Sequence, residues 1–294
     1  MNVRPIDPAA DIGAIVSIAR ADEEAFRGGL SHIEEAVVRM WWTRTDLEHD
    51  SWIVEHGDRV VAAGWAGLEG EVGEFAGVVA QEAKGRGLGV MLVERGEASA
   101  VAKGASVVRT WVLPEDAAAA ALLCDRGYRE VRRFYDMAIE LEEEPVVPGL
   151  PPPLELDSFR EEDAPAFHAA MIESFRDHWD WHGAPFDEWW RLRHDNDHSL
   201  WFLVRDRDEI AAIVRNETRR SGGYVGLLGV RRPWRGRGLG KVLLYRAFAE
   251  FWRRGLTRVS LDVDAESPTG ATKLYERVGM TVEGAMVVYE RPLE

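Results

Sequence analysis

The peptide Gly-Arg-Gly-Leu-Gly occurs twice in this chain, at residues 85–89 and again at residues 236–240. Each copy follows an apolar stretch typical of a strand, residues 74–79 and 224–230, and opens a segment typical of a helix. A glycine-rich turn between a strand and a helix exposes backbone N–H groups at the positive end of the helix. Such a turn binds anions, most often phosphate. The sequence therefore predicts a duplicated phosphate-binding unit.

Two well-known phosphate motifs fit these loops poorly. A dinucleotide fingerprint needs the spacing G-x-G-x-x-G, whereas the glycines here are spaced G-x-G-x-G. A Walker A loop needs Gly-Lys followed by Ser or Thr, which neither copy has. The pattern present is Arg235-x-x-Gly238-x-Gly240. It resembles the pyrophosphate loop of the GNAT superfamily of N-acetyltransferases, which reads Q/R-x-x-G-x-G/A.

A second segment extends this resemblance. Residues 271–280 read Ala-Thr-Lys-Leu-Tyr-Glu-Arg-Val-Gly-Met, which is similar to the superfamily's A-x-x-L-Y-E-x-x-G-F/M. Because the glycine pattern recurs in the first half, the resemblance covers nearly the whole chain as a tandem acetyltransferase. The repeat keeps its register, with separations of 152, 151 and 152 residues between matched landmarks. The landmarks are Asp11 and Asp163, Gly85 and Gly236, and Gly127 and Gly279.

The resemblance implies acetyl-CoA as co-substrate and no metal. Backbone groups of residues 228–230 would hold the pantetheine arm and the thioester, and amides of residues 235–241 would take the pyrophosphate. Nearby cations suit the negative charges of coenzyme A, although Arg231 and Arg232 equally fit a solvated basic face. Ser267 would contact the cofactor or cap the next helix. The expected cofactor-binding residues are Leu228, Gly229, Val230, Arg235, Gly236, Arg237, Gly238, Leu239, Gly240, Lys241 and Ser267 in the second half, and Val79, Lys84, Gly85, Arg86, Gly87 and Gly89 in the first.

Acetyl transfer to an amine requires two proton movements. An amine with a pKa of about 10.4 must lose a proton before it attacks, and the departing thiolate benefits from gaining one. In the superfamily the tyrosine of the L-Y-E segment commonly supplies the second proton, and Tyr275 occupies that position. Alignment of Gly127 on Gly279 places Leu123 at the equivalent site. Since leucine has no proton to give, the second half is expected to be catalytic.

The general base has several candidates. Relatives often carry a glutamate on the strand before the loop, but residues 224–230 contain no acid. Glu217, near the end of the preceding strand, is the candidate placed first. Asp262 and Asp264, on the following strand, are alternatives, and a water chain could also remove the proton.

The element pattern predicts an α/β (α+β) fold made of two tandem domains, each a mixed sheet flanked by helices. In the second half we expect helices over 164–175, 186–193, 239–254 and 269–278, and strands over 201–205, 210–215, 224–230, 259–263 and 286–289. A charged and then proline-rich stretch around residues 142–153 cannot continue a helix or a central strand. The expected domains are residues 1–143 and 152–294, with a linker at 144–151.

The composition restricts the classes of binding partner and the compartment that we expect for the protein. A formal net charge of −15 disfavours binding to nucleic-acid phosphate. The N-terminus lacks a signal-type apolar core, and no apolar run approaches the roughly 20 residues that span a bilayer. The single cysteine, Cys124, cannot form an intramolecular disulfide and fits a reducing compartment. We therefore expect a cytoplasmic monomer or weak dimer that binds neither nucleic acid nor membrane.

The acceptor is expected to be the amine of a small molecule. The tandem layout with an active carboxyl half resembles the mycothiol synthase group of the superfamily. That group is expected to place a glutamate and a tyrosine at substrate-contacting positions on the strands flanking the loop, where this sequence has Tyr224 and Asp262. Mycothiol synthase itself is one alternative. A non-catalytic acyl-CoA sensor is another, but it would have no use for Tyr275.

Histidines and tryptophans in the second half suggest two further ideas. Two histidine pairs at i, i+4 spacing lack cysteine partners and an HExxH motif, so a metal site is not expected. Four tryptophans cluster in the segment that, in the superfamily, lies over the acceptor site. They indicate either packing between helix and sheet or an aromatic wall for the acceptor. The residues are His178, His182, His194 and His198, and Trp179, Trp181, Trp189 and Trp190.

Overall fold

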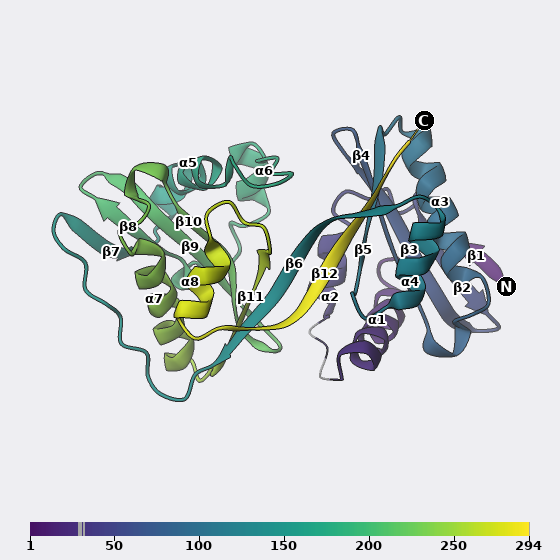
Figure 1. The fold of residues 1–294 in the computed structure, drawn as a ribbon, viewed down its shortest axis with the longest axis horizontal. Helices are drawn as coiled ribbons and strands as arrows, with labels where there is room; N and C mark the ends of the chain where they lie inside the picture. The colour runs from purple at the N-terminus through teal and green to yellow at the C-terminus, as the bar shows by residue number, and fades with distance from the viewer. Residues whose placement is uncertain (29–30, 32, 294) are drawn as a thin grey trace. The chain divides into compact units, whose positions relative to one another are not determined.

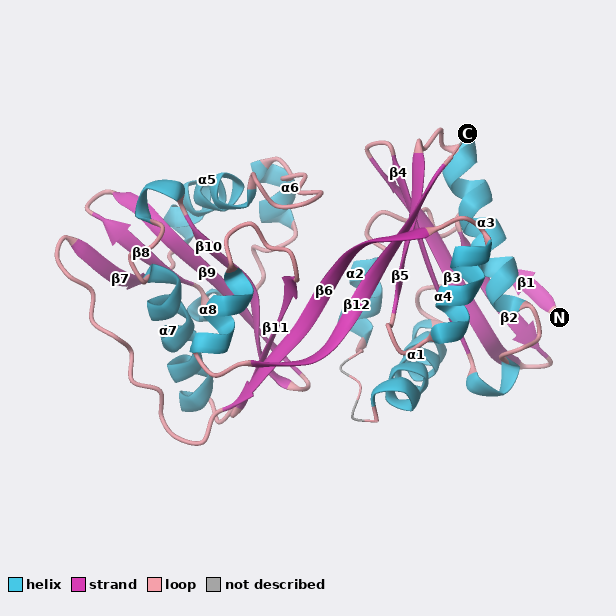
Figure 2. Ribbon diagram, in the orientation of Figure 1, coloured by secondary structure: helices cyan, strands magenta, loops and turns pink. Residues whose placement is uncertain are grey.

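The computed structural model describes residues 1–28, 31 and 33–293 (Figure 1). The chain forms two compact units. The first unit combines Met1–Arg133 with Ala285–Glu294, and the second unit is Phe134–Gly284. Each unit has its own run of paired strands and its own helices (Figure 2), so the α/β fold class expected from the sequence is confirmed.

In the first unit the paired strands follow the order β1-β2-β3-β4-β5-β12. Its strands pair antiparallel except for β4 and β5, which run parallel. The elements are β1 (Asn2–Arg4), α1 (Ile12–Arg27), α2 (Glu35–Trp41), β2 (Ser51–His56), β3 (Arg59–Glu69), β4 (Val72–Val79), the 3-10 helix η1 (Gln81–Ala83), α3 (Leu88–Ala102), β5 (Val107–Val112), α4 (Ala117–Asp125) and most of β12 (Thr281–Pro292).

The second unit repeats this plan, with the strand order β6-β11-β10-β9-β8-β7 and one parallel pair, β10 with β11. Its elements are most of β6 (Arg129–Glu140), β7 (Leu154–Ser158), η2 (Glu161–Asp163), α5 (Ala164–Phe175), α6 (Phe186–Arg191), η3 (His198–Leu200), β8 (Phe202–Asp206), β9 (Glu209–Arg219), β10 (Gly222–Val230), η4 (Arg232–Trp234), α7 (Leu239–Arg253), β11 (Arg258–Asp264) and α8 (Ala271–Arg277).

The compact units and the sequence repeat divide the chain differently, because the last strand of each repeat pairs in the other unit. Residues 134–140 of β6 pair with β11, and residues 287–292 of β12 pair with β5. Each half of the sequence therefore supplies the strand that completes the other unit's sheet. The expected boundary at 143/152 follows the repeat, whereas the compact units meet within β6 and β12.

The core of the second unit explains why α7 lies against the sheet. Phe248 and Phe251 of α7 are 1% and 0% exposed, and burial of one such ring stabilises the fold by about 1.5–3 kcal/mol. A Cβ atom at Gly223 of β10 would lie only 2.5 Å from the Phe251 ring. A glycine at this position therefore lets helix and sheet approach closely.

A buried carboxylate closes the end of α7. Glu250 is 5% exposed and accepts hydrogen bonds from Arg246, Arg253 and Arg254. Although burial opposes ionisation, these guanidinium groups lower the pKa of Glu250 from 4.5 to about 2. Because the pKa is lower in the folded state, the stabilisation is present above about pH 4.5 and is lost as the pH falls toward 2.

We predict that Glu250→Gln lowers the free energy of unfolding by about 2–3 kcal/mol at pH 7. The loss should shrink as the pH falls below about 4.5, where the wild-type carboxylate takes up protons in the unfolded chain. Urea unfolding at pH 7 and pH 4 measures both values. Glu276→Gln, at an exposed position of α8, is the matched control. A pH-independent loss at position 250 would contradict the electrostatic explanation.

Most expected elements of the second unit are present. The helix predicted over 164–175 coincides with α5, and the prediction over 239–254 ends one residue beyond α7. The prediction over 186–193 is two residues longer than α6. Within the described part of the chain, no helix has the length and apolar character needed to cross a membrane.

Candidate active site

Strands β10 and β11 separate after a short parallel pairing. They pair through Gly223 with Val259 and through Tyr224 with Ser260. Further along, β10 stays paired with β9 as far as Val230, and β11 stays paired with β6. Beyond these residues, the facing edges of β10 and β11 no longer pair with each other. An extended ligand can pair with backbone groups on such an edge.

The loop after β10 turns through two left-handed glycines. Gly236 has φ +77° and Gly238 has φ +80°, angles that an L side chain rarely adopts. No atom lies within 4 Å of the position that a Cβ would take at either glycine. The backbone angle, rather than crowding, therefore requires glycine here. The space beside the loop remains open for a ligand.

The same loop presents the positive end of α7. Gly238 is the N-cap residue, and the N–H of Val242 donates to the C=O of Gly238. The N–H groups of residues 239–241 precede this first helical bond and have no acceptor within the helix. Together with the helix dipole, they give the loop a geometry that can bind an anion, and binding of a pyrophosphate here stays a prediction.

Some of the cations around the loop are held by hydrogen bonds or ion pairs within the protein, and others are not. Arg235 donates to the backbone C=O of Val230 at 3.1 Å and of Ser174 at 3.1 Å, which closes the loop onto α5. Arg231 pairs with Glu173 and Glu209, and Arg232 pairs with Asp177. Among the described residues, no carboxylate forms an ion pair with Arg237 or Lys241. These two exposed cations are therefore available to a bound anion.

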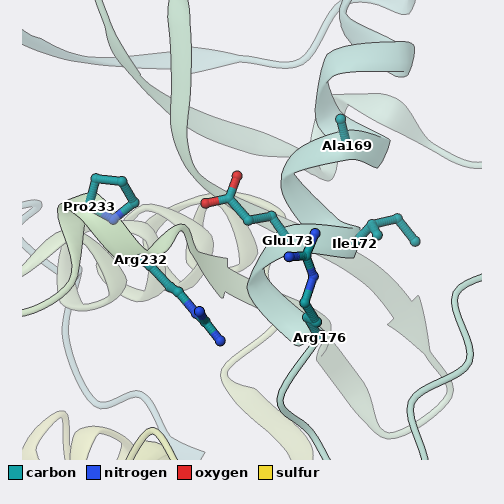
Figure 3. Close-up of a pocket in the computed structure, with 6 residues that line it drawn as sticks. All are labelled: Ala169, Ile172, Glu173, Arg176, Arg232 and Pro233. Carbon is teal, nitrogen blue, oxygen red and sulfur yellow. The ribbon is translucent and has the colours of Figure 1, made fainter.

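A hollow of about 660 Å³ adjoins this loop. Figure 3 shows its lining, which comes from α5 and its C-terminal end on one side and from η4 on the other. The lining residues are Ala169, Ile172, Glu173, Arg176, Arg232 and Pro233. Because two guanidinium groups line the hollow, an anionic ligand held by the loop can extend into it.

Tyr275 lies on α8, which packs against the start of α7. The Leu274 side chain lies 2.9 Å from the position of a Cβ at Gly240, so α8 touches the glycine loop. Tyr275 is 7% exposed, and its burial raises the pKa of the phenol. A raised pKa keeps the hydroxyl protonated at neutral pH.

Ser267 precedes α8 but does not cap it. The N-cap residue of α8 is Gly270, whereas the Ser267 hydroxyl lies 3.0 Å from the Thr269 hydroxyl. The capping interpretation of Ser267 is therefore wrong. Contact with the cofactor stays a prediction for this residue.

A β-bulge interrupts β10 where the strands separate. Its register against β9 shifts between Val225 and Leu227, so Gly226 is the extra residue. A bulge leaves backbone groups outside the ladder. The C=O of Gly226 accepts a hydrogen bond from Arg215 at 3.2 Å. The bulge thus holds polar backbone groups beside the opening between β10 and β11.

A hydrogen-bonded pair spans the same opening. The Tyr224 hydroxyl donates to the Asp262 carboxylate at 2.7 Å, and the Arg219 guanidinium lies 3.2 Å from the centre of the Tyr224 ring. Burial and the Asp262 charge raise the pKa of Tyr224. Asp262 itself is exposed. The pair therefore presents a neutral phenol beside an accessible carboxylate.

Glu217 lies opposite Tyr224 in the β9–β10 pairing but is engaged by two arginines. Its carboxylate lies 2.8 Å from Arg219 and 3.6 Å from Arg215. The structure thus brings the candidate bases Glu217 and Asp262 to one face of the sheet. Asp264, the third candidate, is buried and accepts from the N–H of Glu266.

The first unit repeats the loop with two differences. Gly85 and Gly87 are left-handed, with φ +74° and +81°, and Lys84 holds the loop to α1 through Asp22 at 2.5 Å. However, β3 and β4 pair without a register shift, so the bulge is absent there. Leu123 also stands where the second unit has Tyr275.

Hydrogen bonds support this last equivalence. The C=O of Leu123 accepts from the N–H groups of Arg126 and Tyr128, as the C=O of Tyr275 accepts from those of Val278 and Met280. The first unit therefore has the anion loop, but neither the phenol nor the bulge.

The tryptophans of the second unit mainly pack. Trp189 is 3% exposed and stacks with Phe167 and Trp190, and Trp181 packs against Phe175. Trp179 lies 6.2 Å from Phe134 of β6. These contacts favour the packing interpretation. Across the described residues, no three His, Cys, Asp or Glu side chains group as a metal site.

Three arginines of this face, Arg193, Arg215 and Arg219, were not identified from the sequence, whereas Glu217 was. Arg215, Glu217 and Arg219 alternate along β9, and Arg193 precedes η3. The period-two spacing of charges at 215, 217 and 219 within an apolar strand was the available signal. It indicates a polar patch on one face of the sheet.

Comparisons with known proteins agree with this geometry. The family model described as the Acetyltransferase (GNAT) family matches residues 15–128 and again 156–280. A GCN5-related N-acetyltransferase of known structure from Sphaerobacter thermophilus is 30% identical, with a TM-score of 0.85 over 99% of this chain and 95% of that one.

Two curated relatives carry the name mycothiol acetyltransferase. The protein from Salinispora arenicola is 34% identical over 203 residues, which cover 63% of this chain and 63% of that protein. This match spans less than two thirds of the relative's length. The protein from Propionibacterium freudenreichii is 28% identical over 96% of this chain and 89% of its own length. With two matched domains on one chain, the protein belongs to the acetyltransferase (GNAT) family, in its tandem form.

Proposed function

We propose that the protein transfers an acetyl group from acetyl-CoA to the amine of a small molecule, and that the second unit performs the reaction. The observation that carries the proposal is the opening between β10 and β11, which lies beside the bulge at Gly226 and leads to the glycine loop. The helix α8, which carries the buried phenol of Tyr275, packs against this loop through Leu274. The first unit has the loop without the phenol or the bulge. Family membership supports an acyltransferase, and the acceptor follows from the argument below.

The proposed cofactor site uses backbone more than side chains. The pyrophosphate would bind the N–H groups of residues 236–241 at the start of α7. Arg237 and Lys241 would add charge, while Arg235 holds the loop closed. The pantetheine arm would pair with the edge of Leu228–Val230 and bring the thioester to the bulge. Ser267 would contact the cofactor from the loop before α8.

The chemistry needs three groups in the second unit. A carboxylate accepts the ammonium proton, and the free amine attacks the thioester carbonyl to form a C–N bond. The charge that develops on the carbonyl oxygen is stabilised by backbone N–H groups at the bulge. The C–S bond then breaks, Tyr275 gives its proton to the departing sulfur, and the nitrogen gives up its second proton, which restores the phenol. The products are an amide and coenzyme A with a free thiol.

Asp262 is better placed than Glu217 to accept the amine proton. Glu217 is ion-paired with Arg215 and Arg219, whereas Asp262 accepts a hydrogen bond from a neutral phenol. A carboxylate that is exposed and not committed to a guanidinium can reach an incoming ammonium group. Glu217, the base expected first from the sequence, stays a prediction that the same experiment tests.

We predict that Asp262→Asn lowers kcat by about 10²–10⁴, whereas Glu217→Gln causes a much smaller loss. Both replacements keep the side-chain shape and remove one negative charge. Steady-state thiol release measures the rates, and calorimetric titration of acetyl-CoA should give unchanged affinity in both variants. Full activity of Asp262→Asn together with an inactive Glu217→Gln would assign the base to Glu217 instead.

The first unit is proposed to bind coenzyme A without catalysis. Its left-handed glycines match those of the second unit, and its cofactor residues would be Val79 and residues 84–89. Calorimetric titration would then give two sites per chain. One site per chain would limit cofactor binding to the second unit and leave the proposed reaction intact.

Thiol release with a panel of small amines tests the proposed function. The expected result is free coenzyme A together with an amine product that is one acetyl group heavier. A non-catalytic sensor would bind acetyl-CoA and release no thiol with any amine.

A further inference from the structure

Two arginines are buried near one another on the reaction face of the second unit. Arg215 lies on β9, and Arg193 follows α6. The Nε atoms of both are buried and, within the described residues, have no hydrogen-bond partner. The Arg193 guanidinium lies 6.0 Å from the centre of the Trp189 ring, and its Nη1 donates one long hydrogen bond, of 3.5 Å, to the C=O of Trp189. A buried donor without a partner is unfavourable.

The surrounding charges do not balance this pair. Among the described residues, Glu217 is the one carboxylate whose charge favours the protonated form of both guanidinium groups, and it also pairs with Arg219. Although burial opposes it, nearby negative charges, that of Asp262 included, raise the pKa of Arg219. Burial, and then the Arg215 charge, lower the pKa of Arg193 to about 10. Burial also lowers the pKa of Arg215. Three guanidinium groups therefore share two carboxylates.

Two buried like charges that share one counter-ion, as Arg193 and Arg215 share Glu217, are unfavourable for a fold. Such pairs are retained where a ligand supplies the opposite charge, because guanidinium groups bind carboxylate and phosphate through paired N–H donors. The Arg215 side chain keeps 15% of its surface exposed, so the pair is reachable from solvent.

The position of the pair relates it to the reaction. Arg215 donates to the C=O of Gly226, at the bulge where the thioester is proposed to lie. On the same face, Tyr224 and Asp262 form the pair that is proposed to meet the ammonium group. The face thus has a carboxylate for a cation and, beside the bulge, two guanidinium groups for an anion.

We propose that Arg193 and Arg215 bind an anionic group, a carboxylate or a phosphate, that the acceptor carries in addition to its amine. This inference rests on the proposed acetyl transfer and narrows its substrate class to zwitterionic small molecules. Asp262 and Tyr224 receive the ammonium end, and the arginine pair receives the anionic end. The acceptor is thereby oriented with its nitrogen toward the thioester.

Matched amines test the substrate class with the full-length protein. Phenylalanine and phenethylamine differ by a carboxylate, and glucosamine 6-phosphate and glucosamine differ by a phosphate. We expect the anionic member of at least one pair to have a kcat/KM at least about tenfold higher, as one charge-assisted hydrogen bond implies. The pair that shows the preference identifies carboxylate or phosphate as the anion.

Arg193→Met tests the subsite directly, since Arg215 also supports the bulge. The variant should raise KM for the anionic acceptor about 10–100-fold and leave KM for its neutral partner unchanged. Arg193→Lys should recover part of the affinity. Arg191→Met, at an exposed position of α6, is the matched control and should change neither constant.

A stability measurement gives an independent readout without any acceptor. If Arg193 is an uncompensated buried charge, Arg193→Met should raise the Tm of the free protein by roughly 2–4 °C. A fall in Tm would identify Arg193 as a structural residue and overturn the proposal. For amines that are not acetylated, titration of the amine into the complex of the protein with coenzyme A measures the affinity instead. Equal affinity for both members of each pair would also overturn the proposal.

The failures of the two proposals are distinguishable. If acetyl-CoA does not bind, the proposed function fails and this inference with it. If neutral amines and their anionic partners are acetylated with equal kcat/KM, the proposed acetyl transfer stands and only the anion subsite is wrong.

Discussion

Tyr275→Phe is expected to lower kcat by about 10²–10⁴ while the affinity for acetyl-CoA stays nearly unchanged. The substitution removes one hydroxyl and keeps the ring, so the packing of α8 survives. The buried phenol has a raised pKa and therefore stays protonated until the thiolate departs. Steady-state thiol release with the best amine of the panel measures the rate, and calorimetry measures acetyl-CoA binding.

Two controls make this result specific. Tyr289→Phe makes the same change on β12 in the first unit and should leave the rate unchanged. Leu123→Ala removes a side chain that is 2% exposed, which should lower stability by about 2–5 kcal/mol without affecting the chemical step. A fully active Tyr275→Phe would show that the phenol does not donate the proton.

Gly238→Val is expected to raise the Kd of the second unit for acetyl-CoA by at least about tenfold. A β-branched residue strongly disfavours φ +80°, so the turn must change and the N–H groups of α7 move away from the pyrophosphate. The new side chain would also enter the open space beside the loop. Calorimetric titration measures the affinity, and thermal unfolding measures the accompanying loss of stability.

Gly87→Val is the matched variant in the first unit. Gly87 has φ +81° and an equally open surrounding, so the loss of stability should be similar. Because catalysis is assigned to the second unit, kcat and KM should remain those of the wild type. If Gly87→Val abolishes activity and Gly238→Val does not, the catalytic unit has been assigned the wrong way round.

Local patterns allowed the sequence to predict the loops and most helices. Left-handed turns restrict residue type so strongly that Gly85, Gly87, Gly236 and Gly238 identify the anion site without coordinates. The helix over 164–175 was predicted correctly, because a proline near its start and a regular apolar face indicate a helix and where it begins.

The strand exchange could not be predicted from the sequence. The apolar run in β12 predicts a buried strand, and Val287 and Val288 are both buried, but the run does not identify the sheet in which they lie. A buried edge strand has the same amino-acid composition whichever strand pairs with it. The pairing of β12 with β5, and of β6 with β11, therefore emerges only from the fold.

On the polar face of the second unit, sequence reasoning named Tyr224, Asp262 and Glu217, but it did not predict how these side chains are arranged. Tyr224 and Asp262 lie 38 residues apart, and their contact depends on where two parallel strands separate. Arg193 and Arg215 are unremarkable as sequence positions. Their interest arises from burial and from the shortage of nearby carboxylates, which depend on tertiary structure.

Single-turnover acetyl transfer tests the central claim most directly. The full-length protein, loaded with acetyl-CoA, is mixed with the best amine of the panel, and thiol release and acetylated amine are followed together. We predict that both appear at the same rate, that Tyr275→Phe slows both equally, and that Gly87→Val leaves both unchanged. Tight acetyl-CoA binding without acetylated product from any amine would contradict the account and favour a sensor.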